Sequence, residues 1–301
     1  MLPRIGFIGI GNMGSGMAAN LLKRSYPLSI YDKFESSRFK ELVDTGASRR
    51  ASIVELTDHS DVLISMVPST EHVQDLYLND KRGILSILSS QKRSNTLLID
   101  CSTIDPVASV KVGDACRAAG QRFVDAPVSG GVTGAIAGSL TFMVGSKSAD
   151  FTETAGILSS MGRPIDCGGP GKGAAVKVCN NLILGVTMLG VAEGYRLADH
   201  LGVDLNVFNS IVNASSGQCW SSEKYNPVPG LKAGVPAERG YQGGFAIDLM
   251  IKDLGLAQSA ANGTANIAEF AKTEYSKIKD KGKGHLDFGC VFEFMDSVSK
   301  K

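Results

Sequence analysis

The stretch Arg4-Ile5-Gly6-Phe7-Ile8-Gly9-Ile10-Gly11-Asn12-Met13-Gly14 decides the fold of this 301-residue chain. A short apolar run typical of a buried strand precedes G-x-G-x-x-G, and residues 15–22 continue with helical spacing. Strand, glycine motif and helix in this order predict a dinucleotide-binding unit. Gly9 permits a tight turn, Gly11 leaves room for a pyrophosphate beside the backbone, and Gly14 lets the helix pack against the strand. The first N–H groups of the helix would then face the anion.

The glycine motif alone is a weak signal, and a second strand supports it. Residues 28–32 read Leu-Ser-Ile-Tyr-Asp, which places Asp32 at a strand end 18 residues after Gly14. A carboxylate there can accept hydrogen bonds from the adenine-ribose hydroxyls, and it repels a 2′-phosphate. We therefore expect NAD rather than NADP, a choice that the positive charges of Lys33 and Arg38 could relax.

Further apolar runs alternate with helical patterns through the first half of the chain, at residues 61–67, 96–100, 122–126 and 140–144. Such runs predict a parallel sheet covered by helices on both faces, so we expect an α/β Rossmann-type domain over residues 1–166. Ligands of such sheets bind beyond the carboxyl ends of the strands, where Val67, Pro68, Ser102 and Thr103 fall. Proline and serine are also ordinary turn residues, so both interpretations of these positions stay open.

Residues 125–135 read Asp-Ala-Pro-Val-Ser-Gly-Gly-Val-Thr-Gly-Ala and hold no basic residue. Ser129 offers a hydroxyl, and Gly130 and Gly131 expose backbone N–H groups. Together they would form a small concave site suited to a carboxylate. A flexible connection before the next strand would show the same pattern, and the sequence alone separates the two poorly.

Lys177 is the most informative single residue. It lies near the start of a long helical pattern, and residues 178–192 carry no charged side chain. An ammonium group on so apolar a helix is costly unless it has a partner or a task. Asn181 follows four residues later, so both side chains leave the helix on the same face and could handle one proton and orient one hydroxyl or carboxylate. The alternative is a lysine that extends its amine to solvent from a helix end.

Helical periodicity dominates the second half, and we expect an all-α domain over residues 167–301 that includes the long linking helix. That helix, about residues 174–200, is apolar on most faces and is expected to be a buried central strut. A loop with three prolines follows over about residues 221–242, next to Trp220. In the helical pattern of residues 245–257, Lys252 and Asp253 point in different directions and are taken as solvated.

Composition excludes several classes of function. Lys+Arg 31 against Asp+Glu 30 give a net charge of +1, which offers no field for nucleic acid or an anionic membrane. The four histidines have no ligand spacing, so no metal site is expected. The six cysteines form no C-x-x-C and are expected to be small buried residues in a reducing compartment. The first strand begins near residue 5, so no secretory signal is expected, and the apolar run of 15 residues after Lys177 is expected to be a core helix rather than a membrane span.

Four blocks spread from end to end resemble the 3-hydroxyisobutyrate dehydrogenase family of β-hydroxyacid dehydrogenases: residues 6–14, 123–144, 171–181 and 245–256. A narrower block in residues 215–245 resembles the valine-pathway dehydrogenase more than relatives that act on glycerate, tartronate semialdehyde or 4-hydroxybutyrate. The resemblance implies that Lys177 is catalytic and that Ser129, with Gly130 and Gly131, and Asn181 contact the substrate. The residues expected to bind the cofactor are Gly9, Gly11, Asn12, Met13, Gly14, Asp32, Val67, Pro68, His72, Thr103, Phe245 and Lys252. His72 is the weakest of these, because the family usually has Asn at that position.

The reaction that this resemblance implies is oxidation of 3-hydroxyisobutyrate to methylmalonate semialdehyde by NAD, in valine degradation. Lys177 would act as general base, and as the acid in reverse. A free lysine has a pKa of about 10.4, and apolar surroundings, the positive nicotinamide and the helix N-terminus should all lower that pKa. No metal is required, because a hydride acceptor and a base suffice.

Three alternatives remain open: a semialdehyde or glyoxylate reductase on the same fold, a non-enzymatic oligomerising platform, and a decarboxylating sugar-phosphate dehydrogenase. Lys177 argues against the platform, and about 100 residues after the long helix are few for the sugar-phosphate enzyme. The apolar helix favours a homodimer or homotetramer. The resemblance implies the mitochondrial matrix, with the cytoplasm as the alternative because no leader is visible.

Overall fold

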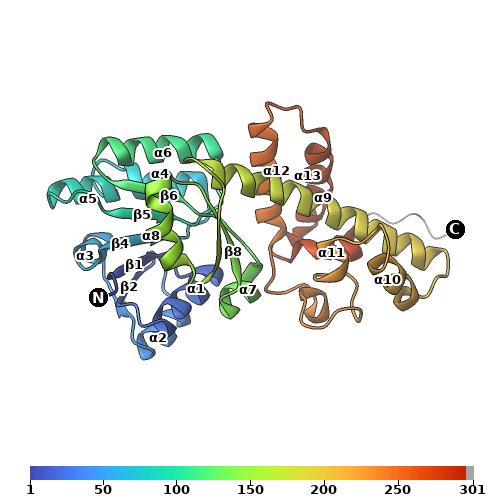
Figure 1. Cartoon of the computed structure of the whole chain (residues 1–301). Helices are drawn as coiled ribbons and strands as arrows, with labels where there is room; N and C mark the ends of the chain where they lie inside the picture. Colours follow the sequence, from blue (N-terminus) through green and yellow to red (C-terminus); the bar gives the residue numbers. More distant parts are fainter. Residues whose placement is uncertain (296–301) are drawn as a thin grey trace. The chain divides into compact units, whose positions relative to one another are not determined.

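The apolar runs of the first half form a parallel sheet in the computed structural model, which describes residues 1–295 (Figure 1). Its strands are β1 (Ile5–Ile8), β2 (Leu28–Tyr31), β3 (Ser48–Arg49), β4 (Val62–Ser65), β5 (Leu97–Asp100) and β6 (Arg122–Asp125). They lie in the order β3-β2-β1-β4-β5-β6, and every pair is parallel. This is the strand order of a Rossmann fold, in which the chain reverses direction across the sheet between β1 and β4.

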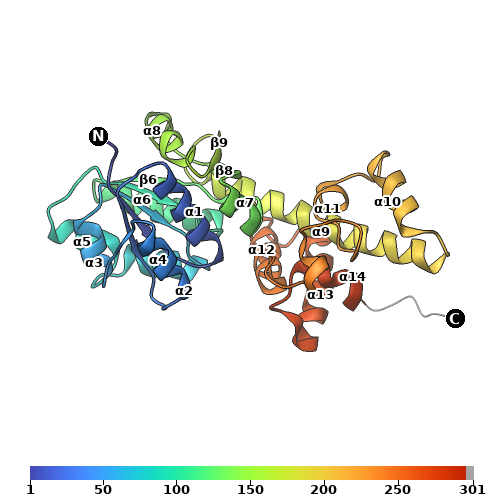
Figure 2. The same cartoon turned by 90° about the horizontal axis from the view of Figure 1, so that it is seen from below.

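Helices cover both faces of this sheet, as the sequence predicts (Figure 2). Successive residues of a strand face opposite sides of the sheet and therefore belong to different hydrophobic cores. Phe7 packs with residues of α1 (Asn12–Lys23), α2 (Ser37–Asp44), α7 (Gly131–Ala137) and α8 (Ser148–Leu158). Ile8 packs with residues of α3 (Ile53–Asp58), α4 (Thr70–Leu78), α5 (Ile84–Ser90) and α6 (Pro106–Ala118). The sheet is therefore fixed from both sides, and the strand ends are left to carry function.

The run at residues 140–144 does not join the large sheet, and to that extent the sequence prediction is wrong. It forms β8 (Leu140–Val144) in a separate three-stranded sheet with β7 (Val128–Ser129) and β9 (Gly162–Asp166). β8 is antiparallel to β7 and parallel to β9. An apolar run shows that a strand is buried but does not identify its neighbours, and here the short β7 pairs with β8 after the chain has left β6.

The chain separates into two compact units, Met1–Lys177 and Val178–Lys301. The second is helical, as the sequence predicts, and its elements are α9 (Lys172–His200, which begins in the first unit), α10 (Leu205–Asn213), α11 (Trp220–Glu223), η1 (Pro236–Arg239), α12 (Ile247–Ala260), α13 (Asn266–Ile278), η2 (Lys279–Lys283), η3 (Phe288–Cys290) and α14 (Val291–Phe294). Its core joins α9, α12 and α13. Gly185 lets α12 approach closely, since a Cβ there would lie 2.9 Å from the sulfur of Met250. The Tyr275 hydroxyl donates a hydrogen bond to the Gly185 carbonyl oxygen at 2.9 Å.

α9 is less buried than its sequence suggests. Val176, Ile183 and Leu197 are 42%, 60% and 51% exposed, so the prediction of a strut buried all round is wrong for the single chain. The physical reason is that the helix carries more apolar surface than its own chain covers. By length and composition alone this 29-residue helix could also cross a membrane, a test that core helices of soluble proteins pass as well.

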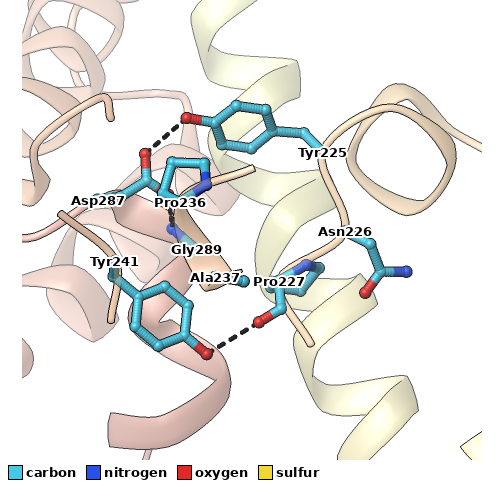
Figure 3. A pocket seen from close by; sticks show the side chains of 8 residues that line it. All are labelled: Tyr225, Asn226, Pro227, Pro236, Ala237, Tyr241, Asp287 and Gly289. Carbon is cyan, nitrogen blue, oxygen red and sulfur yellow. Dashed lines mark hydrogen bonds between the residues drawn. The ribbon is translucent and has the colours of Figure 1, made fainter. Parts of the chain in front are cut away.

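The proline-rich loop after α11 is tightly anchored (Figure 3). Asp287 accepts hydrogen bonds from the Tyr225 hydroxyl at 2.8 Å and from the backbone N–H of Phe245 at 2.7 Å, and the Tyr241 hydroxyl donates to the Pro227 carbonyl at 2.9 Å. Burial raises the pKa of Asp287 to about 6. These contacts hold the loop, and Phe245 just before α12, against Asp287, which comes directly before η3.

The expectation that the six cysteines are buried holds for three of them. Cys101, Cys116 and Cys290 are buried, whereas Cys179 is exposed and Cys167 and Cys219 are half-buried. Cys179 lies on α9 beside Val178, on a face that the single chain does not cover, which the composition could not show.

Candidate active site

The glycine loop has the geometry that a dinucleotide requires. Gly9 has φ +98°, and a Cβ there would lie 2.1 Å from the Met66 carbonyl oxygen, so only glycine can join β1 to the loop beside β4. A Cβ on Gly14 would lie 1.8 Å from the Gly9 carbonyl oxygen. Gly11 faces open space, and the N-terminus of α1 has no side-chain cap. The exposed backbone and the uncapped N–H groups fit a pyrophosphate.

Asp32 is joined to this loop by two hydrogen bonds. Its carboxylate accepts from the backbone N–H of Ile10 at 2.7 Å and from that of Phe34 at 3.0 Å. The acid is therefore fixed at the carboxyl end of β2, next to the glycine motif. Arg38 donates to the side-chain oxygen of Asn12 at 2.6 Å, which brings a guanidinium group to the same loop.

The ends of β4 and β5 are held together by a buried carboxylate that the sequence analysis did not single out. Asp100 accepts hydrogen bonds from the hydroxyls of Ser65 and Ser102, both at 2.7 Å. The Ser102 hydroxyl in turn accepts from the backbone N–H of Val67 at 2.9 Å. Burial raises the pKa of Asp100 to about 6. This network fixes the backbone that leads to Pro68, one of the predicted cofactor contacts.

The remaining predicted contacts of this region lie on the same edge of the sheet. Pro68 is exposed and Thr103 is half-buried, directly after β4 and β5. His72 lies in the first turn of α4, where its Nδ1 is 2.8 Å from the hydroxyl of the capping residue Ser69. That contact gives His72 a local structural role.

The segment after β6 is shaped by its glycines. Ser129 is the last residue of β7 and pairs with Thr141 of β8. Gly130 and Gly131 have φ +131° and +63°, conformations that favour glycine. The chain turns sharply here, so Ser129 comes directly before the start of α7, whose N-cap residue is Gly130 and which has no side-chain cap.

Lys177 and Asn181 are both buried, at 7% and 1% relative exposure. They lie one turn apart on α9, so the two side chains leave the helix on the same face. A lysine that reaches for solvent would be exposed, so burial removes the alternative that the sequence left open.

In the second unit, Asn181 belongs to a polar cluster with Lys252 and Asp253, and Asp253 was wrongly expected to be solvated. Its amide nitrogen donates to Asp253 Oδ2 at 2.5 Å, and Lys252 Nζ lies 3.0 Å from Asp253 Oδ1. Asp253 is 1% exposed, so it is not a solvated residue. Met250, Leu254 and Ala257 are buried on α12, and their spacing places Asp253 on the same face. This spacing was the available signal.

The predicted site residues therefore fall into two sets. The first unit contains the glycine loop, Asp32, the ends of β4 and β5, Ser129 with its two glycines, and Lys177. The second unit contains Asn181, Lys252 and Phe245, whose ring packs edge-on against Phe288 with centroids 5.8 Å apart. Among residues 1–295, no cluster of three His, Cys, Asp or Glu side chains could hold a metal ion.

This architecture defines a class, an NAD(P)-binding oxidoreductase with a helical second domain. Residues 4–169 match the family model for the NAD binding domain of 6-phosphogluconate dehydrogenase. Residues 171–294 match the model described as NAD-binding of NADP-dependent 3-hydroxyisobutyrate dehydrogenase.

The chain belongs to the 3-hydroxyisobutyrate dehydrogenase family. It is 43% identical to the mitochondrial 3-hydroxyisobutyrate dehydrogenases of Bos taurus and Homo sapiens over 97% of this chain and 86% of each relative. The structure of 3-hydroxyisobutyrate dehydrogenase from Mycobacterium tuberculosis, described with L-serine, aligns with a TM-score of 0.87 and 34% identity, covering 97% of this chain and 99% of that one. The resemblance predicted from the sequence is thereby confirmed.

Proposed function

We propose that this protein oxidises 3-hydroxyisobutyrate to methylmalonate semialdehyde with NAD, a step of valine degradation. The observation that carries the proposal is the buried pair Lys177 and Asn181, one turn apart on α9, in a chain of this family. L-serine, named with the Mycobacterium tuberculosis relative, is itself a small 3-hydroxy acid, which supports a substrate of this size and chemistry.

The chain's residues divide the work of an alcohol oxidation. Bound NAD supplies the hydride acceptor, and the alcohol loses one hydride and one proton to become the aldehyde. Lys177 takes the hydroxyl proton, for which its amine must be neutral. Asn181, oriented by Asp253, holds the reacting hydroxyl. Ser129 and the backbone N–H groups of Gly130 and Gly131 hold the carboxylate.

Asp32 supports the preference for NAD. Its carboxylate is fixed by the backbone of Ile10 and Phe34, so it cannot swing away from a ribose at this strand end without losing two hydrogen bonds. A 2′-phosphate would meet a fixed negative charge there. Arg38, next to Asn12, is the nearby positive group that would moderate this preference.

A related reaction on the same fold is the second candidate. A semialdehyde or glyoxylate reductase would use the same base and the same carboxylate site with a substrate of different length. The buried Lys177 favours either enzyme over the non-enzymatic platform, because burying an ammonium group is costly and a role in proton transfer gives a reason for that cost.

The protein acts as a homodimer or homotetramer in this proposal, with no nucleic acid or membrane partner. Exposed apolar residues gather in the second unit on α9, α10 and the turn between them: Ile183, Leu197, Leu201, Val203, Val207 and Ile211. α10 has no buried residue at all, so its apolar side needs another surface. A second copy of the chain would cover it.

The mitochondrial matrix is the proposed location. The names of the curated relatives from animals and plants include "mitochondrial", and valine degradation would supply the substrate there.

The test is NADH production by the purified protein with 3-hydroxyisobutyrate, glycerate, 3-hydroxypropionate and 4-hydroxybutyrate, each with NAD and with NADP. We expect the highest kcat/KM with 3-hydroxyisobutyrate and NAD. A higher kcat/KM with another acid would move the enzyme to the second candidate. No turnover with any acid, while NADH still binds, would support the platform and overturn the proposal.

A further inference from the structure

The N-terminus of α9 has no local capping residue. Residues 168–171 read Gly-Gly-Pro-Gly, which offers no side-chain oxygen to the first N–H groups of the helix. A helix leaves four such groups without partners inside the helix, and they usually bond to a side chain close by in sequence.

Asp125, 46 residues earlier, supplies the missing acceptors. Its Oδ1 accepts from the backbone N–H of Gly171 at 2.7 Å, and its Oδ2 accepts from that of Ala174 at 2.9 Å. The carboxylate is 2% exposed and lies at the positive end of the helix dipole. Both oxygens of one side chain therefore hold the start of α9.

The neighbours of Asp125 pack closely around it. A Cβ on Gly145 would lie 2.5 Å from Asp125 Oδ2, and a Cβ on Gly173 would lie 2.1 Å from the Met143 carbonyl oxygen. The backbone of Asp125 also pairs with that of Gly145, with N to O distances of 3.2 Å and 2.7 Å. Hydrogen bonds of Asp125 therefore join the end of β6 to the residue after β8 and to the start of α9.

Asp125 connects two parts of the proposed active site. It is the last residue of β6, four residues before Ser129, and Ala174 is one helical turn before Lys177. We propose that Asp125 is a positioning residue, whose carboxylate fixes the first turn of α9 and thereby sets the placement of Lys177 relative to the Ser129 loop. The catalytic part of this inference rests on the proposed function.

The test compares Asp125→Asn with Asp105→Asn. Asparagine keeps the size of the side chain but replaces one acceptor oxygen with a donor that would face a backbone N–H. Asp105 is the matched control, because its carboxylate caps α6 by accepting from Ala108 N–H at 2.8 Å, on a helix without proposed catalytic residues. Each variant is measured for NADH affinity by fluorescence, for kcat and KM, and for hydrogen exchange of the peptide that covers residues 171–177.

We expect Asp125→Asn to speed exchange in residues 171–177 at least tenfold and to lower kcat about 100-fold, with NADH affinity within threefold of wild type, since small misplacements of a reacting group have effects of this size. Asp105→Asn should change none of these values by more than about threefold. Unchanged exchange in residues 171–177 would overturn the anchoring role, and faster exchange with unchanged kcat would overturn the positioning role.

If Asp125→Asn no longer binds NADH, Asp125→Ser is measured in the same way, because its hydroxyl keeps one acceptor. Loss of NADH binding in both variants would overturn the inference, since Asp125 would then support the whole first unit. A wild-type protein inactive with every hydroxy acid would instead overturn the proposed function, and with it the catalytic part of the inference. The exchange experiment would still decide the anchoring.

Discussion

The side-chain amide of Asn181 donates a hydrogen bond to Asp253 Oδ2 at 2.5 Å, from one buried polar residue to another. A buried carboxylate is costly unless its charge is balanced, and here Asn181 donates to Oδ2 while the ammonium group of Lys252 lies 3.0 Å from Oδ1 as an ion pair. The contact fixes which way the Asn181 amide faces. In the proposed site, Asp253 would therefore orient the Asn181 amide towards the substrate, although the sequence analysis did not expect Asp253 to contact one.

Replacing Asp253 with Asn should lower kcat/KM for the hydroxy acid about 10- to 100-fold. The variant places a second amide against Asn181, and an unmatched buried polar group costs about 1–3 kcal/mol. The matched control is Asp248→Asn on the same helix, where the carboxylate is half-exposed and pairs with Lys279 at 3.0 Å. Steady-state kinetics decide the matter. Equal kinetics for the two variants would show that Asp253 does not orient Asn181.

Replacing Asp32 with Ala should shift the ratio of kcat/KM for NAD to that for NADP towards NADP by at least about tenfold. The reason is the removal of a fixed negative charge from the place where a 2′-phosphate would lie, since like charges in contact cost several kcal/mol. Glu35→Ala removes an exposed acid three residues later and should leave the ratio unchanged. An Asp32→Ala enzyme with the wild-type ratio would place cofactor discrimination elsewhere.

Asp100 should make stability depend on pH between about 4 and 6. Burial raises the pKa of Asp100 to about 6, whereas an unfolded Asp has a pKa of about 3.9. The folded state therefore holds this proton more tightly, so its contribution is fully present below about pH 4 and is lost as pH rises through 6.

Asp100→Asn removes this titration while leaving an oxygen for Ser65 and Ser102. The free energy of unfolding of the variant, relative to wild type, should rise between pH 4 and pH 7 in urea titrations. If this difference in unfolding free energy does not change with pH, the pKa of Asp100 is not raised in the folded state.

The exposed face of α10 should hold copies of the chain together. Ile211→Asp places a charge where the isolated chain exposes 58% of an isoleucine, and it should reduce the molar mass seen by light scattering to that of the monomer. Val54→Asp, at a 50% exposed valine of α3, is the matched control and should leave the mass unchanged. A wild-type protein that is already monomeric would contradict the proposed assembly.

Much of the fold follows from local sequence, because its signals are local. Only glycine fits at Gly9, which has φ +98° and lies close to the Met66 carbonyl, and at Gly14, which lies close to the Gly9 carbonyl. The turn from β1 to α1 is therefore encoded within a few residues. The neighbours of a strand are not encoded locally. The run at residues 140–144 would be buried in either sheet, and its pairing with β7 and β9 depends on where the preceding turn directs the chain.

The residues of the candidate site also differ in how clearly the sequence alone reveals them. Lys177 is conspicuous because it is charged in an apolar helix. Asp125 and Asp100 are not, because a carboxylate at a strand end is common and their partners lie up to 49 residues away in sequence. Asp253 could have been found, since its spacing from Met250, Leu254 and Ala257 puts it on the buried face of α12.

The most direct test of the central claim is kcat for Lys177→Ala beside Lys172→Ala, an exposed lysine of the same helix, with NADH affinity measured for both. Because general acid–base catalysis contributes about 10²–10⁴-fold, we expect Lys177→Ala to lose at least about 100-fold in kcat while NADH affinity stays within threefold, and Lys172→Ala to match wild type. In wild type, activity should rise with pH as the Lys177 amine loses its proton. A Lys177→Ala enzyme that binds NADH and keeps kcat within tenfold of wild type would contradict the account.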